Sequence, residues 1–229
     1  MRLLTLLLFL CATLCYAQEK EPINRTWTSI AGTKVDAELV SFTDREVVLK
    51  LKDGKTIKLR LDKLAEYDRY FLKGLEKAIV PEDGIKFHQL DDNFLDIIQG
   101  KKGNKEYIHY LNKKRFSGVA YRMRPNPDRD LFTKPTDEAY FTNDVWDVIT
   151  FKNGLINGVK SFRPNGQKSS EEILDGKKGV KNGLSISWNE SGKIISVKNY
   201  KDGEVVKGSV KFWNSKGEEV DSYKEANKE

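Results

Sequence analysis

Apolar and polar positions alternate in three short stretches near the N-terminus. The apolar rows are Val35, Ala37 and Leu39, then Val47, Leu49 and Leu51, then Ile57, Leu59 and Leu61. Alternation with a period of two predicts strands that bury one face. Between the last two rows, a three-residue loop over 52–54 pairs Leu49 with Ile57, whereas a two-residue turn pairs it with Lys58. We therefore expect the three-residue loop, with Gly54 in the left-handed conformation.

The apolar period then lengthens to three or four residues. The apolar positions are Leu64, Tyr67, Phe71, Leu75 and Ala78, a spacing typical of an amphipathic helix. Asp62 is the expected N-cap, and Pro81 prevents continuation. Residues 82–104 are expected to form a linker or a second, short helix, whose apolar positions would be Phe87, Leu90, Phe94, Ile97 and Ile98.

Glycines and aromatics recur at a near-constant period in the C-terminal half. The repeated positions are Gly158, Gly183 and Gly208, then Gly166, Gly192 and Gly217, with Phe162, Trp188 and Trp213 each four residues before the second glycine. Asn153-Gly154, Asp175-Gly176 and Asp202-Gly203 are expected in equivalent turns. This pattern predicts stacked β-hairpin units. The three repeated aromatics are expected to lie on one side of one sheet, as core residues.

The N-terminal stretches resemble an SLA-one homology domain. The likeness is carried by residues 25–29, Gly32, 35–40, 47–55 and 61–64. It implies an SH3-like β-barrel over residues 22–81. In a yeast endocytic adaptor this module binds Asn-Pro-Phe-x-Asp peptides, so the resemblance also implies peptide binding. Trp27 is the aromatic residue that we expect at such a contact, with a place in the core or at the barrel edge as the alternative.

The C-terminal half resembles the MORN-type repeat in the form found in bacterial YwqK-like proteins. The matching residues include 151–154, 165–168, 191–193 and 200–203, and a weaker copy covers 110–121. The resemblance implies a repeat sheet over residues 105–225. Its known members include proposed antitoxins and membrane-associated scaffolds. The sequence thus predicts a mainly-β protein, with a small SH3-like barrel and short helix followed by a β-hairpin repeat sheet.

A stretch over residues 122–147 interrupts the array and contains three prolines. Insertions in repeat arrays become loops, often on the binding face. The stretch also contains Tyr140, Phe141 and Trp146, and aromatic residues are favoured at interfaces. We take these three aromatics as candidate binding residues, with a disordered spacer as the alternative.

The first 17 residues have the features of a signal peptide. Arg2 precedes an apolar run over 3–15, and small residues at Cys15 and Ala17 mark a cleavage site after Ala17. The run is too short to span a bilayer. The pattern predicts a secreted or periplasmic protein. Because Cys11 and Cys15 are the only two cysteines, the processed protein would have no disulfide, thiolate metal site or cysteine nucleophile.

Charge is abundant but evenly mixed. The 40 basic and 34 acidic residues give a net charge of +6, and even the longest basic runs are short, such as 113–115. A nucleic-acid groove would require a one-sided basic stripe, so we expect no nucleic-acid partner. Weak attraction to an anionic surface polymer is compatible with this charge.

The sequence contains no recognisable catalytic, cofactor or metal motif. We therefore expect an exported, non-enzymatic binding or scaffold protein of the cell envelope, which recognises a protein, a peptide or a surface polymer and has no stable membrane insertion. One alternative is an envelope hydrolase using carboxylates near His88, where Asp91 and Asp92 form the local His–carboxylate group. Another is a membrane-associating repeat sheet. The ligand, the oligomeric state and cooperation between the two modules stay open.

Overall fold

The computed structural model describes residues 22–87, 96–99, 105–128 and 141–227, with the backbone alone over 96–99 and 105–107. The fold is mainly β, as predicted. The N-terminal region begins with an antiparallel four-stranded sheet in the order β1-β2-β3-β4. Its strands are β1 (Asn24–Thr28), β2 (Lys34–Phe42), β3 (Glu46–Leu51) and β4 (Thr56–Arg60). A 3-10 turn (Leu61–Lys63) and helix α1 (Glu66–Gly74) follow.

The β3–β4 hairpin has the predicted register. Leu49 pairs with Ile57, and Val47 pairs with Leu59. The amide of Leu51 donates to the carbonyl of Lys55 at 2.8 Å, which closes a three-residue loop, and Gly54 has a φ of 84°. The three-residue loop is therefore confirmed, because it is the loop that keeps the apolar residues of both strands on one buried face.

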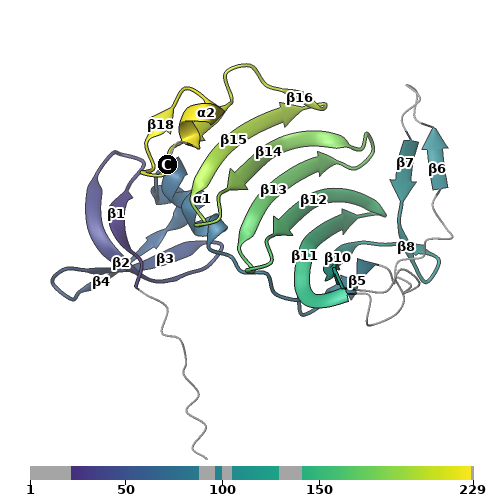
Figure 1. Cartoon of the computed structure of the whole chain (residues 1–229), viewed down its shortest axis with the longest axis horizontal. Coiled ribbons are helices and arrows are strands. Elements are labelled where there is room, and N and C mark those ends of the chain that lie inside the picture. Colours follow the sequence, from purple (N-terminus) through teal and green to yellow (C-terminus); the bar gives the residue numbers. More distant parts are fainter. Residues whose placement is uncertain (1–21, 88–95, 100–104, 129–140, 228–229) are drawn as a thin grey trace, which may run out of the picture.

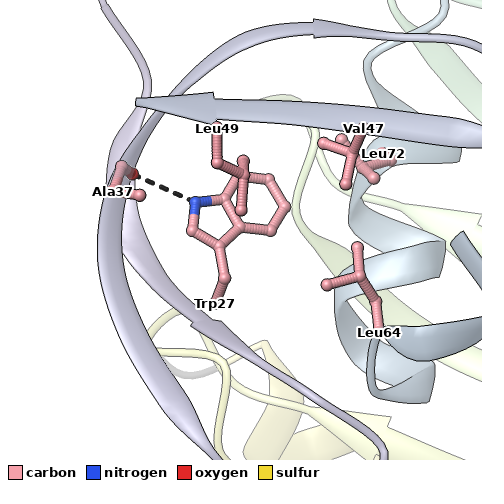
Figure 2. Close-up of a cluster of buried hydrophobic side chains, with 6 residues drawn as sticks. All are labelled: Trp27, Ala37, Val47, Leu49, Leu64 and Leu72. Carbon is pink, nitrogen blue, oxygen red and sulfur yellow. Dashed lines mark hydrogen bonds between the residues drawn. The ribbon is translucent and has the colours of Figure 1, made fainter. Parts of the chain in front are cut away.

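The core of this sheet is apolar and centred on Trp27. Its fully buried members are Trp27, Ala37, Val47, Leu49, Leu64 and Leu72 (Figure 2). The indole nitrogen of Trp27 donates to the carbonyl of Ala37 at 3.0 Å, which satisfies its one polar atom. Backbone hydrogen bonds join Ile30 to Lys63 and Ala65 to Thr28, so the chain after β4 returns to the free edge of β1.

The C-terminal region is dominated by one ten-stranded sheet. Its order is β18-β17-β15-β14-β13-β12-β11-β10-β5, with β16 also pairing with β15. The long strands lie side by side in chain order (Figure 1). The bounds are β5 (Ile85–Lys86), β10 (Gly118–Pro125), β11 (Phe141–Lys152), β12 (Leu155–Phe162), β13 (Lys168–Asp175), β14 (Val180–Trp188), β15 (Ile194–Lys201), β16 (Glu204–Val205), β17 (Lys211–Trp213) and β18 (Glu219–Val220).

Smaller elements accompany the large sheet. A final short helix, α2 (Tyr223–Ala226), follows β18. Two short hairpins precede β10, and they consist of β6 (Asp96–Gln99) with β7 (Lys105–Ile108) and β8 (Tyr110–Leu111) with β9 (Lys114–Arg115).

Three hairpins in this sheet have the same turn. In each, the amide of the first turn residue donates to the carbonyl of the residue four positions later, as Asn189 does to Lys193 at 2.8 Å. The glycine in the fourth position has a positive φ in all three, a conformation that glycine adopts without steric cost. The recurrent glycines of the sequence therefore set the geometry of the hairpins β12–β13, β14–β15 and β17–β18.

Helix α1 lies between the two sheets (Figure 1) and contributes to the cores of both. Leu72 packs with the Trp27 core, whereas Tyr70 packs with Trp188 and Trp213 of the large sheet. Beyond the helix, the amide of Ala78 donates to the carbonyl of Gly166 at 2.8 Å. The segment that was predicted to end the first module therefore also covers the second.

Four local predictions need correction. Asp62 is not the N-cap, because it belongs to the 3-10 turn, and α1 begins at Glu66 after Ala65. The linker or short helix over 82–104 is wrong where it is described, since β5 and β6 are strands; residues 88–95 and 100–104 lie outside the described part. Asp175 and Gly176 do not form a two-residue turn, because a four-residue loop follows Asp175 and Gly179 has the positive φ.

The fourth correction concerns the insertion over 122–147. Its described ends continue the antiparallel strands β10 and β11, with Arg122 opposite Asp147 and Pro125 opposite Phe141. The alternating burial of Val145, Asp147 and Ile149 explains why this part remains in the sheet. Residues 129–140 lie outside the described part.

Candidate functional site

The strand register divides the side chains of the large sheet between two faces. Cross-strand partners point to the same side of a sheet, and successive residues along a strand point to opposite sides. One row of partners points toward α1, on what we call the helix face: Lys160, Glu171, Ile186, Val197 and Lys211. The adjacent row of partners points to the other side, which we call the outer face: Ser161, Ser170, Ser187, Ser196 and Phe212.

The helix face contains the three repeated aromatics. Phe162, Trp188 and Trp213 are all buried, and they pack against Ala78, Tyr70 and Tyr67 of the α1 segment, respectively. Trp188 is 0% exposed, and its indole nitrogen donates to the carbonyl of Tyr70 at 3.0 Å. A Cβ at Gly74 would overlap the Trp188 ring, so the helix approaches this closely only because that residue is glycine. These aromatics are core residues, as predicted.

A group of five charged side chains joins α1 to the helix face. The fully buried Lys168 donates to Glu76 at 2.6 Å and to Glu171 at 2.9 Å. Lys160 also donates to Glu76, and Lys73 donates to Glu171, each at 2.8 Å. Burial raises the pKa of Glu171, but the charge of Lys168 and the hydrogen bonds from Lys73 and Lys168 outweigh it and lower that pKa to about 2. Every carboxylate here is ionised and paired, so the group connects two elements.

Trp27 lies in the core, which is the alternative that the sequence left open for it. The side chain is 1% exposed, and its ring packs edge-on against Phe71 with centroids 6.1 Å apart. The guanidinium of Arg25 lies 5.0 Å from the Trp27 centroid and pairs with Asp68 at 2.7 Å. Burial raises the pKa of Asp68, while the Thr28 amide and the Arg25 charge favour its ionised form. These contacts attach β1 to α1.

Trp146 has different surroundings from the other three tryptophans. It is 40% exposed and occupies a bulge of β11, because Arg122 pairs with Asp147 and Met123 pairs with Val145. The guanidinium of Arg124 lies 5.6 Å from the Trp146 ring centroid, and that of Arg122 lies 5.9 Å from it. We call Trp146, Arg122 and Arg124 the Trp146 patch. It combines an exposed aromatic surface with two guanidinium groups, one of which is paired with Asp147.

Hydrogen bonds hold both arginines of the Trp146 patch in place. Arg122 pairs with the buried carboxylate of Asp147 at 2.8 Å, and Asp147 also accepts from the hydroxyl of Ser161 at 2.6 Å. Arg124 donates to the carbonyl of Phe162 at 2.8 Å, while its buried Nε has no hydrogen-bond partner within the described ranges. Because the Nε is buried, a carboxylate or phosphate ligand would have to pair with the terminal nitrogens of the guanidinium.

Of the predicted site residues outside this patch and Trp27, the structure describes Phe141. Phe141 is half-buried at the start of β11, opposite Pro125. Tyr140 lies outside the described residues, and so do His88, Asp91 and Asp92 of the alternative hydrolase site. Of the four candidate binding aromatics, the structure thus presents Trp146 as the exposed one among those it describes.

Sequence reasoning missed the residues around Trp146. The sequence places Arg122 and Arg124 in an insertion and gives them no role, because their proximity to Trp146 depends on the β10–β11 register. It also missed the outer-face serines, although the sequence carried a signal for them. Ser161 and Ser187 are 26 residues apart, as are Ser170 and Ser196, which matches the repeat period.

Comparisons of the chain with family models, curated proteins and solved structures found no match. Within the described ranges, no cluster of three or more His, Cys, Asp or Glu side chains could hold a metal ion. The same ranges include no helix of the length and apolar character needed to cross a bilayer.

Proposed function

We propose that this chain is an exported, non-enzymatic binding or scaffold protein of the cell envelope, and that the Trp146 patch is its recognition site. The observation that carries the proposal is the exposed Trp146 ring beside two guanidinium groups. Tryptophan and arginine are the residue types most enriched at binding hot spots. The partner is an envelope protein or peptide, or a surface polymer.

The rest of the molecule supports a binding role through rigidity. The strands that carry the patch belong to a sheet whose helix face is closed by α1, Trp188 and the Lys168 ion pairs. A site on such a scaffold loses little freedom when it binds, because its parts are already held. The signal-like residues 1–17 and the resemblance to repeat scaffolds agree with this function.

Site-specific photo-crosslinking in intact cells tests the proposal. A benzophenone amino acid replaces Trp146 in one variant and Ile30, which is 62% exposed on the N-terminal region, in a control variant. We expect a discrete adduct from position 146 that position 30 does not give, with mass spectrometry identifying it. Equal labelling from both positions, or no adduct from position 146, would contradict the proposal.

A further inference from the structure

Four serines form a continuous row across the outer face. Ser161 pairs with Ser170, Ser170 with Ser187, and Ser187 with Ser196, on the consecutive strands β12 to β15. We call these residues the serine row. Neighbouring strands lie about 4.8 Å apart, so the row presents a hydroxyl at that regular interval at right angles to the strands.

Two outer-face serines are among the buried residues of the chain. Ser196 is 5% exposed, and Ser185, between Glu172 and Lys198 in the neighbouring row, is 8% exposed. Neither hydroxyl makes a hydrogen bond to another residue of the described chain. Neither hydroxyl oxygen is fully buried, so water or a ligand above the sheet can supply its hydrogen-bond partner.

Aromatic side chains stand at both ends of the serine row. At the β10–β11 end, Asp147 pairs with Ser161 and leads to Arg122 and the Trp146 patch. At the other end, Ser196 pairs with Phe212, whose ring lies 6.1 Å from that of Tyr223. Helix α2 packs on β15 and β17 at this end, so an extended ligand that follows the row from Trp146 would end against α2.

The charges along the row are positive once the ion pairs are accounted for. Glu172 is neutralised by Lys181 at 2.6 Å, and Asp147 by Arg122 at 2.8 Å. Arg124 at one end and Lys198 near the other form no ion pair within the described ranges. The uncompensated charges are therefore two cations, separated by the hydroxyls of the row.

We propose that the outer face binds an extended anionic polysaccharide, which lies across strands β10 to β15 along the serine row. This rests on the proposed function, because the ligand begins at the Trp146 patch. Sugar hydroxyls exchange hydrogen bonds with the serines, one sugar ring stacks on Trp146, and acidic groups of the polymer meet Arg124 and Lys198. Hydroxyls repeated at about the strand spacing match a chain of sugar rings, whose polar groups also repeat from ring to ring.

A peptide fits this face less well. Extended peptides gain affinity by pairing their backbone with an exposed sheet edge. The serine row lies on strands that are paired on both sides, so their backbone groups are already used. What the face offers is side-chain hydroxyls, and these suit a ligand that is rich in hydroxyl groups.

Binding to alginate oligosaccharides, measured by calorimetry with the purified protein, tests the inference. Dextran serves as the neutral polysaccharide and polyglutamate as the anionic peptide. Ser187→Glu places a negative charge in the middle of the row, and Asn199→Glu places the same charge on the opposite face of the adjacent strand as the matched control. We expect alginate to bind, at least about tenfold tighter than dextran or polyglutamate, and Ser187→Glu alone to weaken it about tenfold or more.

A second variant makes the test independent of the added charge. The double change Ser170→Ala and Ser187→Ala removes two hydroxyls with little change of volume, and we expect about tenfold weaker alginate binding at an unchanged melting temperature. Equal weakening by Ser187→Glu and Asn199→Glu, tighter binding of polyglutamate, or no binding of alginate would overturn the inference. If one of these results is found while position 146 still gives its crosslinked adduct in cells, the proposed function stands and only the polysaccharide ligand is excluded.

Discussion

On the helix face of the large sheet, Trp188 and Lys168 are fully buried under α1. Ser187, the residue before Trp188, points to the outer face, where its cross-strand partners are two other serines. The same strands therefore carry two different kinds of side-chain row. The helix face places large rings and ion pairs against a helix, and its interactions stabilise the fold. Along the serine row the outer face has small hydroxyls that add little packing, whereas toward the other end of β11 it carries the buried Ile149 and Phe151.

The two faces also differ in how their tryptophans are held. Trp188 donates its indole hydrogen to the Tyr70 carbonyl and packs against the helix. Trp146 has no such enclosure, and its ring instead lies beside Arg122 and Arg124. In the large sheet, the three aromatics at the repeat period thus belong to the core, whereas Trp146, which is off that period, is exposed.

The largest expected effect is on stability, from Trp188→Ala. Removing this fully buried ring leaves a cavity, so we expect a loss of about 3–5 kcal/mol in the free energy of unfolding. The matched control is Trp146→Ala, which should cost less than about 1 kcal/mol because the ring is 40% exposed. Denaturant titration of both variants measures the difference. Similar losses in the two would mean that the faces are not distinct in this way.

Acid should weaken the connection between α1 and the sheet. The pKa of Glu171 falls from an ordinary 4.5 to about 2 in the folded protein. A lowered carboxylate pKa gives stability that is complete above the unfolded pKa and is lost as the pH falls from about 5 toward 2. The expected contribution is on the order of 3 kcal/mol.

Glu171→Gln isolates that contribution. The variant should be less stable at pH 7 and should lose less further stability between about pH 5 and 2 than the unchanged protein. Burial raises the pKa of Asp68, so Asp68 favours the folded state more as the pH falls. This contribution is the same in both proteins and does not affect the difference between their pH profiles. Parallel pH profiles of the two proteins would show that the Glu171 ion pairs do not stabilise the fold.

Lys168→Met should have a smaller effect than either change. Methionine keeps the apolar part of the side chain over Trp188, while Glu76 and Glu171 keep Lys160 and Lys73 as partners. We expect a loss of about 1.5–3 kcal/mol, the usual cost of losing a hydrogen bond to a charged group. Thermal unfolding monitored at pH 7 checks this, with Lys198→Met on the outer face as the control. A control that is destabilised as strongly would contradict the assignment.

The smallest expected stability effect is that of Ser187→Ala. The hydroxyl makes no hydrogen bond within the described chain, so the free energy of unfolding should change by less than about 0.5 kcal/mol. Denaturant titration checks it. A loss above about 1 kcal/mol would show that the serine row stabilises the fold after all.

Local patterns in the sequence were sufficient for much of the fold. The three-residue loop at 52–54 followed from keeping Leu49 and Ile57 on one buried face, and the burial of Trp188 followed from its repeat position. Both depend on neighbours in sequence or on a fixed period. Asp62 was misplaced as a cap because a 3-10 turn competes with the first helical turn, which the apolar spacing alone does not reveal.

The candidate site was harder to predict because it depends on register between distant strands. Arg122 reaches Asp147 and Trp146 only through the β10–β11 pairing and its bulge. Lys168 would be expected on the surface from its sequence, yet it is buried because Glu76, 92 residues away, supplies a counter-charge. Trp27 illustrates the converse, since an aromatic within a resembled binding module belongs to the core.

The shared helix also has a consequence for the order of folding during synthesis. The Trp27 core is complete once Leu72 has been made, but Tyr70 meets Trp188 from 118 residues later in the chain, and Glu66 meets Lys211 from 145 residues later. Contacts so distant in sequence form slowly, because a long loop must close before they contribute. The nascent N-terminal region therefore exposes one side of α1 until the last hairpins emerge. Residues 66–74 are where a chaperone would bind a partly made chain.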